Sequence, residues 1–295
     1  MEFRSGFVSI MGSPNVGKST LMNALVGQKI AIATQKAQTT RNKVTGILTR
    51  KDYQIIFLDT PGIHVPKNKL GEYMVKTAYE ANRDVDLTLL LIDAKVGVGE
   101  RDKEILQRLR NGNLMVVINK VDAVSDDMLQ NIRKVLHGLD ISPKQQIEIS
   151  AMQGDGLVQL EKEIVKHLIP GPMFYPEDMV TDKPERFIAA ELIREKALLN
   201  LRDEIPHGIG IDIEKVEELD NLTEVSAVIV CERDSHKGII IGKKGAMLKK
   251  IASQARMDLE VLFGTKVFLQ VFVKVKEDWR NSGHMLKELG YRKEE

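Results

Sequence analysis

The chain has 295 residues, 29% of them charged and 43% hydrophobic, with a formal net charge of +1. This composition is typical of a folded protein rather than a disordered one, and the length suggests two domains. The single cysteine, Cys231, excludes an intrachain disulfide and favours a reducing compartment. We find no signal peptide and no apolar run long enough to span a bilayer, so we expect a cytoplasmic protein.

Residues 1–172 alternate between short apolar runs and amphipathic segments with helical spacing. This alternation predicts a mostly parallel sheet with helices on both faces. Three polar residues, 50–52, join two strand-like runs and predict a hairpin, so one edge strand should be antiparallel. The predicted strands are 7–11, 44–49, 53–58, 87–92, 114–118 and 147–149, and the predicted helices are 19–26, 100–110, 126–139 and 157–168.

The segment G-S-P-N-V-G-K-S, residues 12–19, lies between a predicted strand and a predicted helix. This is the context that a phosphate-binding loop requires. Gly12 and Gly17 let backbone N–H groups turn toward phosphate oxygens, and the helix N-terminus adds partial positive charge. Lys18 would reach the β- and γ-phosphates, and the Ser19 hydroxyl would bind Mg²⁺. The alternative is a glycine-rich turn that binds nothing.

Two later segments offer groups for the metal and the γ-phosphate. Asp59 ends a predicted strand and suits direct or second-shell binding of Mg²⁺. Gly62, in D-T-P-G, can sense the γ-phosphate through its N–H. Thr40, in the segment T-T-R, is the candidate metal-sensing hydroxyl of a first switch, although T-T alone could be an ordinary polar loop.

The segment N-K-V-D, residues 119–122, follows a predicted parallel strand and could read a guanine base. The Asp122 carboxylate accepts two hydrogen bonds, and guanine offers N1–H and the 2-amino group together. Adenine lacks this donor pair, so ATP would leave a buried Asp122 unpaired. On its own, the segment could equally be a strand followed by a capping Asp.

The remaining base contacts are expected from neighbouring residues. Asn119 should anchor the loop and the base edge, and the Lys120 stem should pack on the base face. In Ser150-Ala151, the Ala151 N–H would reach the guanine 6-oxo group. The candidate GTP-binding residues are Gly12, Ser13, Pro14, Asn15, Val16, Gly17, Lys18, Ser19, Thr20, Asp59, Thr60, Pro61, Gly62, Asn119, Lys120, Asp122, Ser150 and Ala151. The candidate catalytic residues are Lys18, Thr40 and Gly62, and the candidate metal ligands are Ser19, Thr40 and Asp59.

The usual water-positioning residue of small GTPases is absent from this pattern. Ile63 stands where many of them have Gln. Because Ile cannot hydrogen-bond to water, we expect slow intrinsic hydrolysis or another positioning group. Arg41 and Arg50 are arginine-finger candidates only by proximity. Asn15 occupies a position where some GTPases hold a monovalent cation such as K⁺, although it could simply cap the turn.

A proline-rich stretch over residues 169–184 predicts a linker, which we place at 173–185 between domains 1–172 and 186–295. The second domain is predicted to have the order helix–strand–strand–helix–helix–strand. The predicted segments are helix 185–201, strands 209–216 and 226–231, helix 246–256, strand 266–276 and a short helix 282–289.

A basic cluster surrounds G-K-K-G, residues 242–245, in the second domain. Six basic and no acidic residues lie between Asp234 and Asp258. In KH domains a G-x-x-G turn between two helices clamps about four nucleotides of single strand. The alternative is a helix–helix turn with a solvated basic face. The candidate RNA-binding residues are Lys237, Ile240, Ile241, Gly242, Lys243, Lys244, Gly245, Lys249 and Lys250.

The motifs G-S-P-N-V-G-K-S-T, Q-T-T-R, D-T-P-G-I-H, N-K-V-D and H-K-G-I-I-I-G-K-K-G resemble those of the Era GTPases over essentially the full chain. The resemblance implies an α/β P-loop GTPase domain followed by an α+β type II KH domain. It also implies an RNA-binding GTPase that uses GTP, GDP and Mg²⁺ and assists maturation of the 30S ribosomal subunit. The implied RNA is the single-stranded 3′ end of 16S rRNA. The family is cytoplasmic and can contact the inner membrane peripherally, and we expect a monomer.

We expect a two-state switch in which GTP and Mg²⁺ order the loops near Thr40 and Gly62, and hydrolysis releases them. The alternative function is an RNA-binding scaffold that holds GTP with little turnover, which Ile63 leaves open.

Overall fold

The computed structural model describes residues 2–34, 36, 39–109 and 112–291. Contacts divide the chain into two compact units. The first unit comprises residues 1–65 and 74–182, and the second comprises residues 66–73 and 183–295. Two predicted features, Gln38 in the Q-T-T-R motif and the helix end at Arg110, lie outside the described residues.

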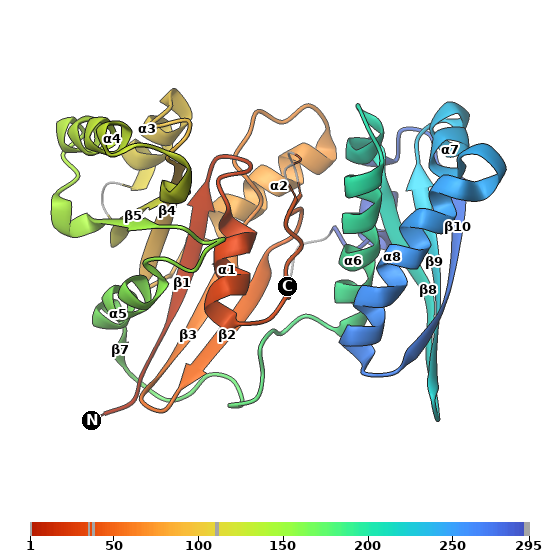
Figure 1. Ribbon diagram of the computed structural model, residues 1–295, viewed down its shortest axis with the longest axis horizontal. Helices are drawn as coiled ribbons and strands as arrows, with labels where there is room; N and C mark the ends of the chain where they lie inside the picture. The colour runs from red at the N-terminus through yellow and green to blue at the C-terminus, as the bar shows by residue number, and fades with distance from the viewer. Residues whose placement is uncertain (1, 35, 37–38, 110–111, 292–295) are drawn as a thin grey trace. The chain divides into compact units, whose positions relative to one another are not determined.

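The first unit contains a mostly parallel sheet with an antiparallel edge, as predicted (Figure 1). Its strand order is β2-β3-β1-β4-β5-β6, and β2 pairs with β3 antiparallel. A two-residue strand, β7, pairs with the start of β1. The strands are β1 (Arg4–Gly12), β2 (Val44–Arg50), β3 (Tyr53–Asp59), β4 (Leu87–Asp93), β5 (Leu114–Asn119), β6 (Gln146–Ile149) and β7 (Ile169–Pro170).

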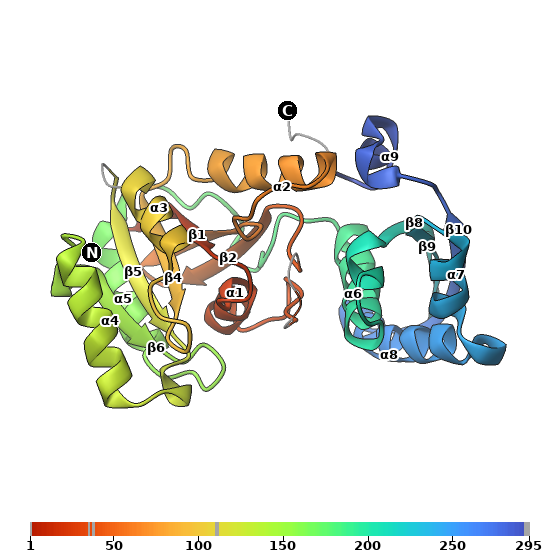
Figure 2. The ribbon, with the colours of Figure 1, turned by 90° about the horizontal axis from the view of Figure 1, so that it is seen from above.

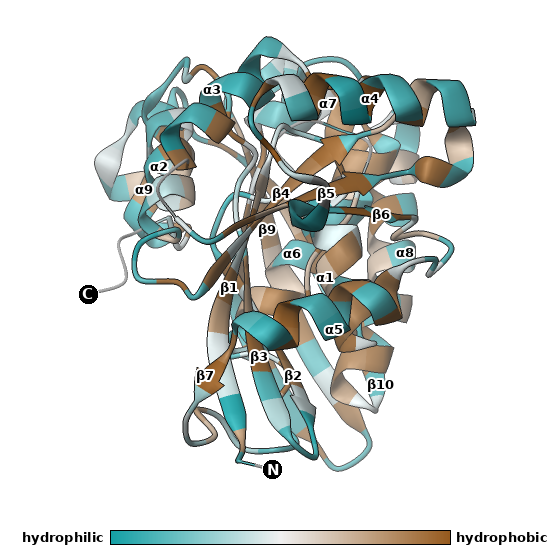
Figure 3. Cartoon of the chain, turned by 90° about the vertical axis from the view of Figure 1, so that its left-hand side faces the viewer, coloured by the Kyte–Doolittle hydropathy of each residue, from teal (hydrophilic) through white to brown (hydrophobic). Residues whose placement is uncertain are grey.

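Helices cover the sheet because its central strands are apolar on both faces. Every residue from 87 to 92 is buried, so neither face of β4 meets water. Figure 3 shows the hydrophobic colour along β4, whereas helices such as α5 alternate hydrophobic and hydrophilic residues. One core cluster joins side chains of α2, α3 and α4 to those of β4 and β5. The helices are α1 (Lys18–Val26), α2 (Lys69–Glu80), α3 (Glu100–Leu109), α4 (Asp126–Gly138) and α5 (Leu157–His167).

Helix α2 was not predicted from the sequence, although its signal is present. Leu70, Met74 and Ala78 are buried at a spacing of four, which is the period of one helix face. No helix in the described part of the chain combines the length and apolar composition needed to cross a bilayer.

The second unit has the predicted order of helices and strands around a three-stranded sheet (Figure 2). In this sheet β9 lies between β8, which is antiparallel to it, and β10, which is parallel. The elements are α6 (Glu185–Asn200), β8 (Gly210–Leu219), β9 (Leu222–Cys231), α7 (Asp234–Ile241), α8 (Ala246–Phe263), β10 (Lys266–Val275) and α9 (Gly283–Glu288). Helix α8 is about two turns longer than predicted because Leu259 continues its buried stripe.

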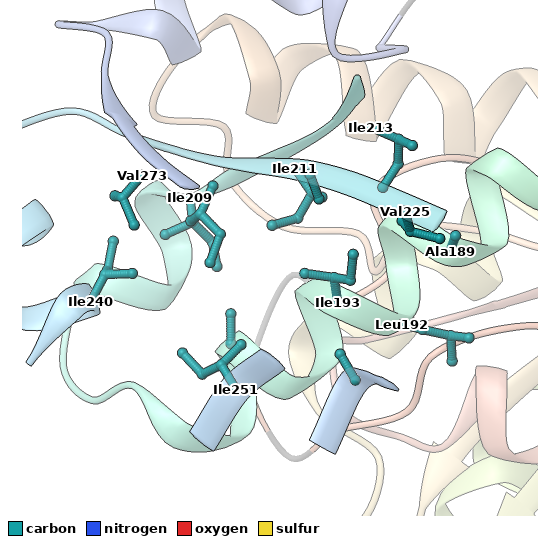
Figure 4. Close-up of a cluster of buried hydrophobic side chains, with 14 of the residues drawn as sticks. Ala189, Leu192, Ile193, Ile209, Ile211, Ile213, Val225, Ile240, Ile251 and Val273 are labelled. Atoms are coloured by element: carbon teal, nitrogen blue, oxygen red, sulfur yellow. The ribbon is translucent and has the colours of Figure 1, made fainter. Parts of the chain in front are cut away.

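The core of the second unit lies between α6, α8 and the helix-facing side of the sheet. Ile193 on α6 and Ile251 on α8 are fully buried with Ile211 of β8 in the same cluster. Figure 4 shows these side chains converging. Alternate residues of β10 join this core, including Val267 and Val273.

The proline-rich stretch after β7 is bound along the first unit, to β2 and β3. The buried Gln54 accepts hydrogen bonds from the N–H groups of Phe174 and Tyr175, at 2.9 and 3.0 Å, and donates to the Tyr175 carbonyl at 2.8 Å. Further along, the Ile47 N–H donates to the Val180 carbonyl at 2.8 Å. Residues 174–180, part of the predicted linker, are therefore fixed as a strap by contacts distant in sequence.

Candidate functional site

The phosphate-binding loop lies between the end of β1 and the start of α1, where the pattern placed it. Gly12 and Gly17 have φ values of +148° and +104°. A Cβ at Gly12 would lie 2.6 Å from the Leu91 carbonyl oxygen, and one at Gly17 would lie 2.3 Å from Asn119 Nδ2. Both positions therefore need glycine for conformation and for space.

The Lys18 ammonium lies over this loop and is buried. Its Nζ donates to the carbonyl oxygens of Gly12 and Ser13, at 3.2 and 3.1 Å. Burial lowers the Lys18 pKa to about 8, an effect that the charges of Asp59 and Asp102 oppose. The two carbonyl oxygens replace only part of the water that an exposed ammonium would bind. The buried Lys18 is therefore favourably placed to bind an anion.

Three predicted metal ligands converge from α1, the loop before β2 and the end of β3. The Ser19 hydroxyl donates to Asp59 Oδ2 at 2.6 Å and lies 2.8 Å from Thr40 Oγ1. Thr40 Oγ1 also donates to Asp59 Oδ2, at 3.4 Å. All three side chains are buried.

The environment of Asp59 fits a hard cation. Its Oδ1 is buried and has no hydrogen-bond partner among the described residues. Burial raises its pKa to about 6, and the Lys18 charge and the two hydroxyls only partly oppose this rise. The described residues contain no group of three or more His, Cys, Asp or Glu side chains that could hold a metal ion. One carboxylate and two hydroxyls nevertheless form a suitable ligand set for Mg²⁺ when waters and phosphates complete the coordination shell.

The predicted base-reading segment is tied to the phosphate loop. Asn119 Nδ2 donates to the Val16 carbonyl at 2.8 Å, and Asn119 Oδ1 accepts the Ala151 N–H at 3.0 Å. Asn119 thus joins two loops, whereas the contact of Ala151 with a guanine 6-oxo group stays a prediction. Asp122 is exposed in a short turn, Val121–Ala123.

Lys120 is held by a residue that sequence reasoning missed. Its Nζ donates to Asp93 Oδ2 at 2.6 Å and to the Asn15 carbonyl at 2.8 Å, and its backbone φ is +68°. The signal that could have found Asp93 is its place at the carboxyl end of β4, the position that Asp59 takes on β3. These bonds fix the stem that was predicted to pack on a base.

The structure places Ile63 in the core rather than in the phosphate site. Its side chain is buried with Met11 and Leu90. The next residue, His64, has Nδ1 at 2.9 Å from the Gly62 carbonyl, and its buried Nε2 has no partner among the described residues. Ile63 therefore serves packing.

The two arginine candidates lie in different surroundings. Arg41 is fully buried near the first switch. Arg50 is at the other end of the hairpin, because it pairs with Tyr53 while Val44 pairs with Asp59. It also forms a 3.1 Å ion pair with Glu161. Arg50 therefore lies the length of β2, roughly 20 Å, from the end of the hairpin that carries the metal ligands. This distance excludes Arg50 as an arginine finger.

The G-K-K-G segment forms the turn between α7 and α8. Gly242 and Gly245 have φ values of +71° and +78°. Lys243 and Lys244 between them are exposed, as are Lys249 and Lys250 on α8, and Lys237 is half-buried. The segment therefore presents cationic side chains around a turn that contains two glycines with positive φ.

Two of the apolar RNA-binding candidates differ in exposure. Ile240 is fully buried in the core of the second unit, so its side chain is not presented to a ligand. Ile241 is partly buried against the same core. The exposed residue of the Ile-Ile-Ile run is Ile239, because α7 turns only its opposite face toward the sheet.

Comparisons with known proteins agree with both units. A family model described as a 50S ribosome-binding GTPase matches residues 7–120, and a KH domain model matches residues 204–280. GTPase Era of Ruminiclostridium cellulolyticum is 52% identical over 295 residues, covering 99% of each chain. The chain belongs to the Era family of GTPases. GTPase Era of Clostridioides difficile is 51% identical over 294 residues, covering 98% of this chain and 99% of its own.

Two solved Era structures share the whole fold. One is an Aquifex aeolicus Era variant bound to GDP·AlF4⁻, and the other is Era in complex with MgGDPNP and nucleotides 1506–1542 of 16S ribosomal RNA. Each has a TM-score of 0.93 and 40% identity, and covers 98% of this chain and 99% of its own. The predicted fold class, a P-loop GTPase domain followed by a KH domain, is confirmed, and this Era-family chain is a GTP-hydrolysing enzyme.

Proposed function

We propose that this Era-family chain is a GTP-dependent switch that binds the 3′ end of 16S rRNA and assists maturation of the 30S subunit. The observation that carries the RNA half is the likeness, over 98% of this chain, to an Era structure holding MgGDPNP and 16S rRNA nucleotides. The convergence of Lys18, Ser19, Thr40 and Asp59 supports the nucleotide half.

The phosphate loop would bind the nucleotide through its N–H groups and through Lys18. The Lys18 ammonium has three N–H donors, and two of them bind the loop carbonyls. The third would meet the β- and γ-phosphates and give the buried cation its anion. Ser19, Thr40 and Asp59 would hold Mg²⁺, which supplies positive charge against the phosphate oxygens. The Gly62 N–H would sense the γ-phosphate, and Asp122 would select guanine.

Slow intrinsic hydrolysis follows from the position of Ile63. A side chain packed in the core cannot orient water, so the chain's GTPase activity would depend on another group or on its RNA partner. The alternative, an RNA-binding scaffold with little turnover, would show a slow rate of GTP hydrolysis that RNA does not change.

Dependence on K⁺ through Asn15 would appear as faster hydrolysis in K⁺ than in Na⁺.

Recognition of RNA would centre on the turn between α7 and α8. Lys243 and Lys244 would meet phosphates, while Gly245, whose Cβ direction has no described neighbour within 4 Å, would allow close approach of the RNA backbone. Ile239 and Ile241 lie beside this turn and offer apolar contact to bases. Contact with the membrane and the monomeric state stay predictions.

The test is binding of a short labelled RNA that matches the 3′ end of 16S rRNA. We expect it to bind more tightly than a scrambled RNA. The double variant K243A/K244A should bind both RNAs more weakly and show a smaller salt dependence, because fewer phosphates are neutralised. Its GTP affinity should be unchanged. Equal affinity for the matched and scrambled RNAs would contradict the proposed target, and loss of GTP binding would indicate misfolding.

A further inference from the structure

A buried carboxylate outside the predicted site contacts the phosphate loop. Asp102 lies in the first turn of α3 and is only 6% exposed. Its Oδ1 accepts a hydrogen bond from the Ser13 hydroxyl at 2.9 Å, and its Oδ2 accepts one from the Gly99 N–H at 3.0 Å. One side chain thus joins the start of a helix to a loop 89 residues away in sequence.

Ser13 connects this carboxylate to Lys18. The Ser13 hydroxyl donates to Asp102, while the Ser13 carbonyl accepts from Lys18 Nζ at 3.1 Å. The orientation of the Ser13 peptide therefore determines where one acceptor of the buried ammonium lies. The Asp102 charge also favours the protonated form of Lys18 and so raises its pKa against the effect of burial.

A capping role alone does not account for Asp102. Its Oδ2 satisfies an N–H before the first turn of α3, as the third residue of a helix often does. That role needs one oxygen and no contact with another loop. A buried negative charge beside a phosphate-binding loop is also unfavourable by itself, because it repels the phosphates. The second oxygen, bound to Ser13, is the feature that needs a functional reason.

We propose that Asp102 is a positioning residue for GTP hydrolysis. It holds the Ser13 side chain, and through Ser13 it fixes the carbonyl that places the Lys18 ammonium. The role of Asp102 rests on the proposed contact of Lys18 with the phosphates. Asp102 would act through Ser13, without itself contacting the nucleotide or the metal.

The test is a double-mutant cycle between Ser13 and Asp102. Steady-state GTP hydrolysis and GDP affinity are measured for the wild type, S13A, D102N and the double variant. Asn offers one acceptor oxygen where Gly99 and Ser13 both donate, so D102N weakens one of the two bonds. S13A removes the link to the loop and leaves the cap of α3 in place. We expect each single variant to lower kcat by about tenfold.

Two results would distinguish a positioning role of Asp102 from a purely structural role in folding. GDP affinity should change by less than about threefold, because GDP offers Lys18 only its β-phosphate, whereas the transition state adds the charge on the γ-phosphoryl group. The double variant should be no slower than the slower single variant, because S13A already breaks the link through which Asp102 acts. E100Q is the matched control: Glu100 lies on the same helix, is exposed and pairs with Lys103, and its kcat should stay at the wild-type value.

Three outcomes would count against these assignments. Wild-type kcat in S13A would overturn the role of Asp102, because that variant keeps the cap and loses only the link. Losses that multiply in the double variant would also overturn it. Wild-type hydrolysis in K18A would instead overturn the proposed phosphate-loop function itself.

Discussion

At the scale of single residues, the nucleotide site brings together charges that are unfavourable without a ligand. Lys18 and Asp59 are both buried. Burial lowers the pKa of Lys18 and raises the pKa of Asp59, which favours the neutral form of each side chain. Ser19 and Thr40 give Asp59 hydrogen bonds at one oxygen only. Nucleotide and cation can relieve this electrostatic cost, as expected where function and stability conflict.

This cost predicts a pH-dependent effect of D59N on the nucleotide-free and metal-free protein. The Asp59 pKa is raised from 3.8 to about 6, so the cost of its charge is full above pH about 6 and declines as the pH falls toward 3.8. At pH about 7.5, D59N should be more stable than the wild type by on the order of 1–3 kcal/mol, and the difference should shrink at pH about 5. Urea unfolding at the two pH values measures it.

The matched control is D52N, which replaces an exposed Asp on the hairpin between β2 and β3. Its effect on the free energy of unfolding should be small at both pH values, because an exposed charge keeps its water. A D59N variant that is less stable than the wild type at both pH values would show that the hydrogen bonds to Asp59 outweigh the buried charge.

At the scale of elements, the turn between α7 and α8 shows that two glycines of one motif serve different purposes. A Cβ at Gly242 would lie 2.7 Å from Met247 Cβ and 2.9 Å from its backbone N. A Cβ at Gly245 would meet no other described residue within 4 Å. Gly242 is thus required by the packing of the turn against α8, and Gly245 only by its left-handed backbone.

We expect G242A to lower the melting temperature and weaken RNA binding together, because the start of α8 must shift. G245A should cost only about 1 kcal/mol of stability, the usual penalty for a side chain at positive φ. The RNA affinity of G245A tests whether binding requires the RNA backbone to approach residue 245 closely. Thermal unfolding and RNA titration of the two variants separate these effects, and equal losses of stability would contradict the assignment.

At the scale of the whole molecule, the proposed switch requires the nucleotide and RNA sites to be coupled. The GTPase and KH models match separate stretches of the chain, 7–120 and 204–280, so any coupling must connect two sites. Thermodynamic linkage makes such coupling reciprocal. If a GTP analogue tightens RNA binding by some factor relative to GDP, RNA must tighten the binding of that analogue by the same factor.

We therefore expect the 3′-end RNA to bind more tightly with a GTP analogue than with GDP, by roughly 5- to 150-fold if the coupling is of ordinary size. The reverse titration, nucleotide binding with and without RNA, should give the same ratio. K243A/K244A is the control. Because this variant binds less RNA at a given RNA concentration, adding RNA should leave its nucleotide affinity close to the value measured without RNA. Equal RNA affinity in the two nucleotide states would show that the chain does not couple its sites.

Much of the fold and of the candidate site could be predicted because the signals are local. Hydrophobic periodicity predicted the strands and most helices, and the hairpin joining β2 to β3 followed from the short polar turn between two apolar runs. The phosphate loop is one continuous segment whose glycines and helix start act through the backbone, so its chemistry can be read without the tertiary structure.

The amino-acid sequence by itself determined the GTPase and KH domains, their order and the segments that carry phosphate, metal and RNA candidates. Only the tertiary structure decided which distant residues support them. Asp102 reaches Ser13 across 89 positions, and Gln54 holds the proline-rich strap across 121. Burial separated Ile240 from Ile239 in one apolar run. Such contacts depend on strand order and register, which bring the carboxyl ends of several strands together and leave no pattern in any single segment.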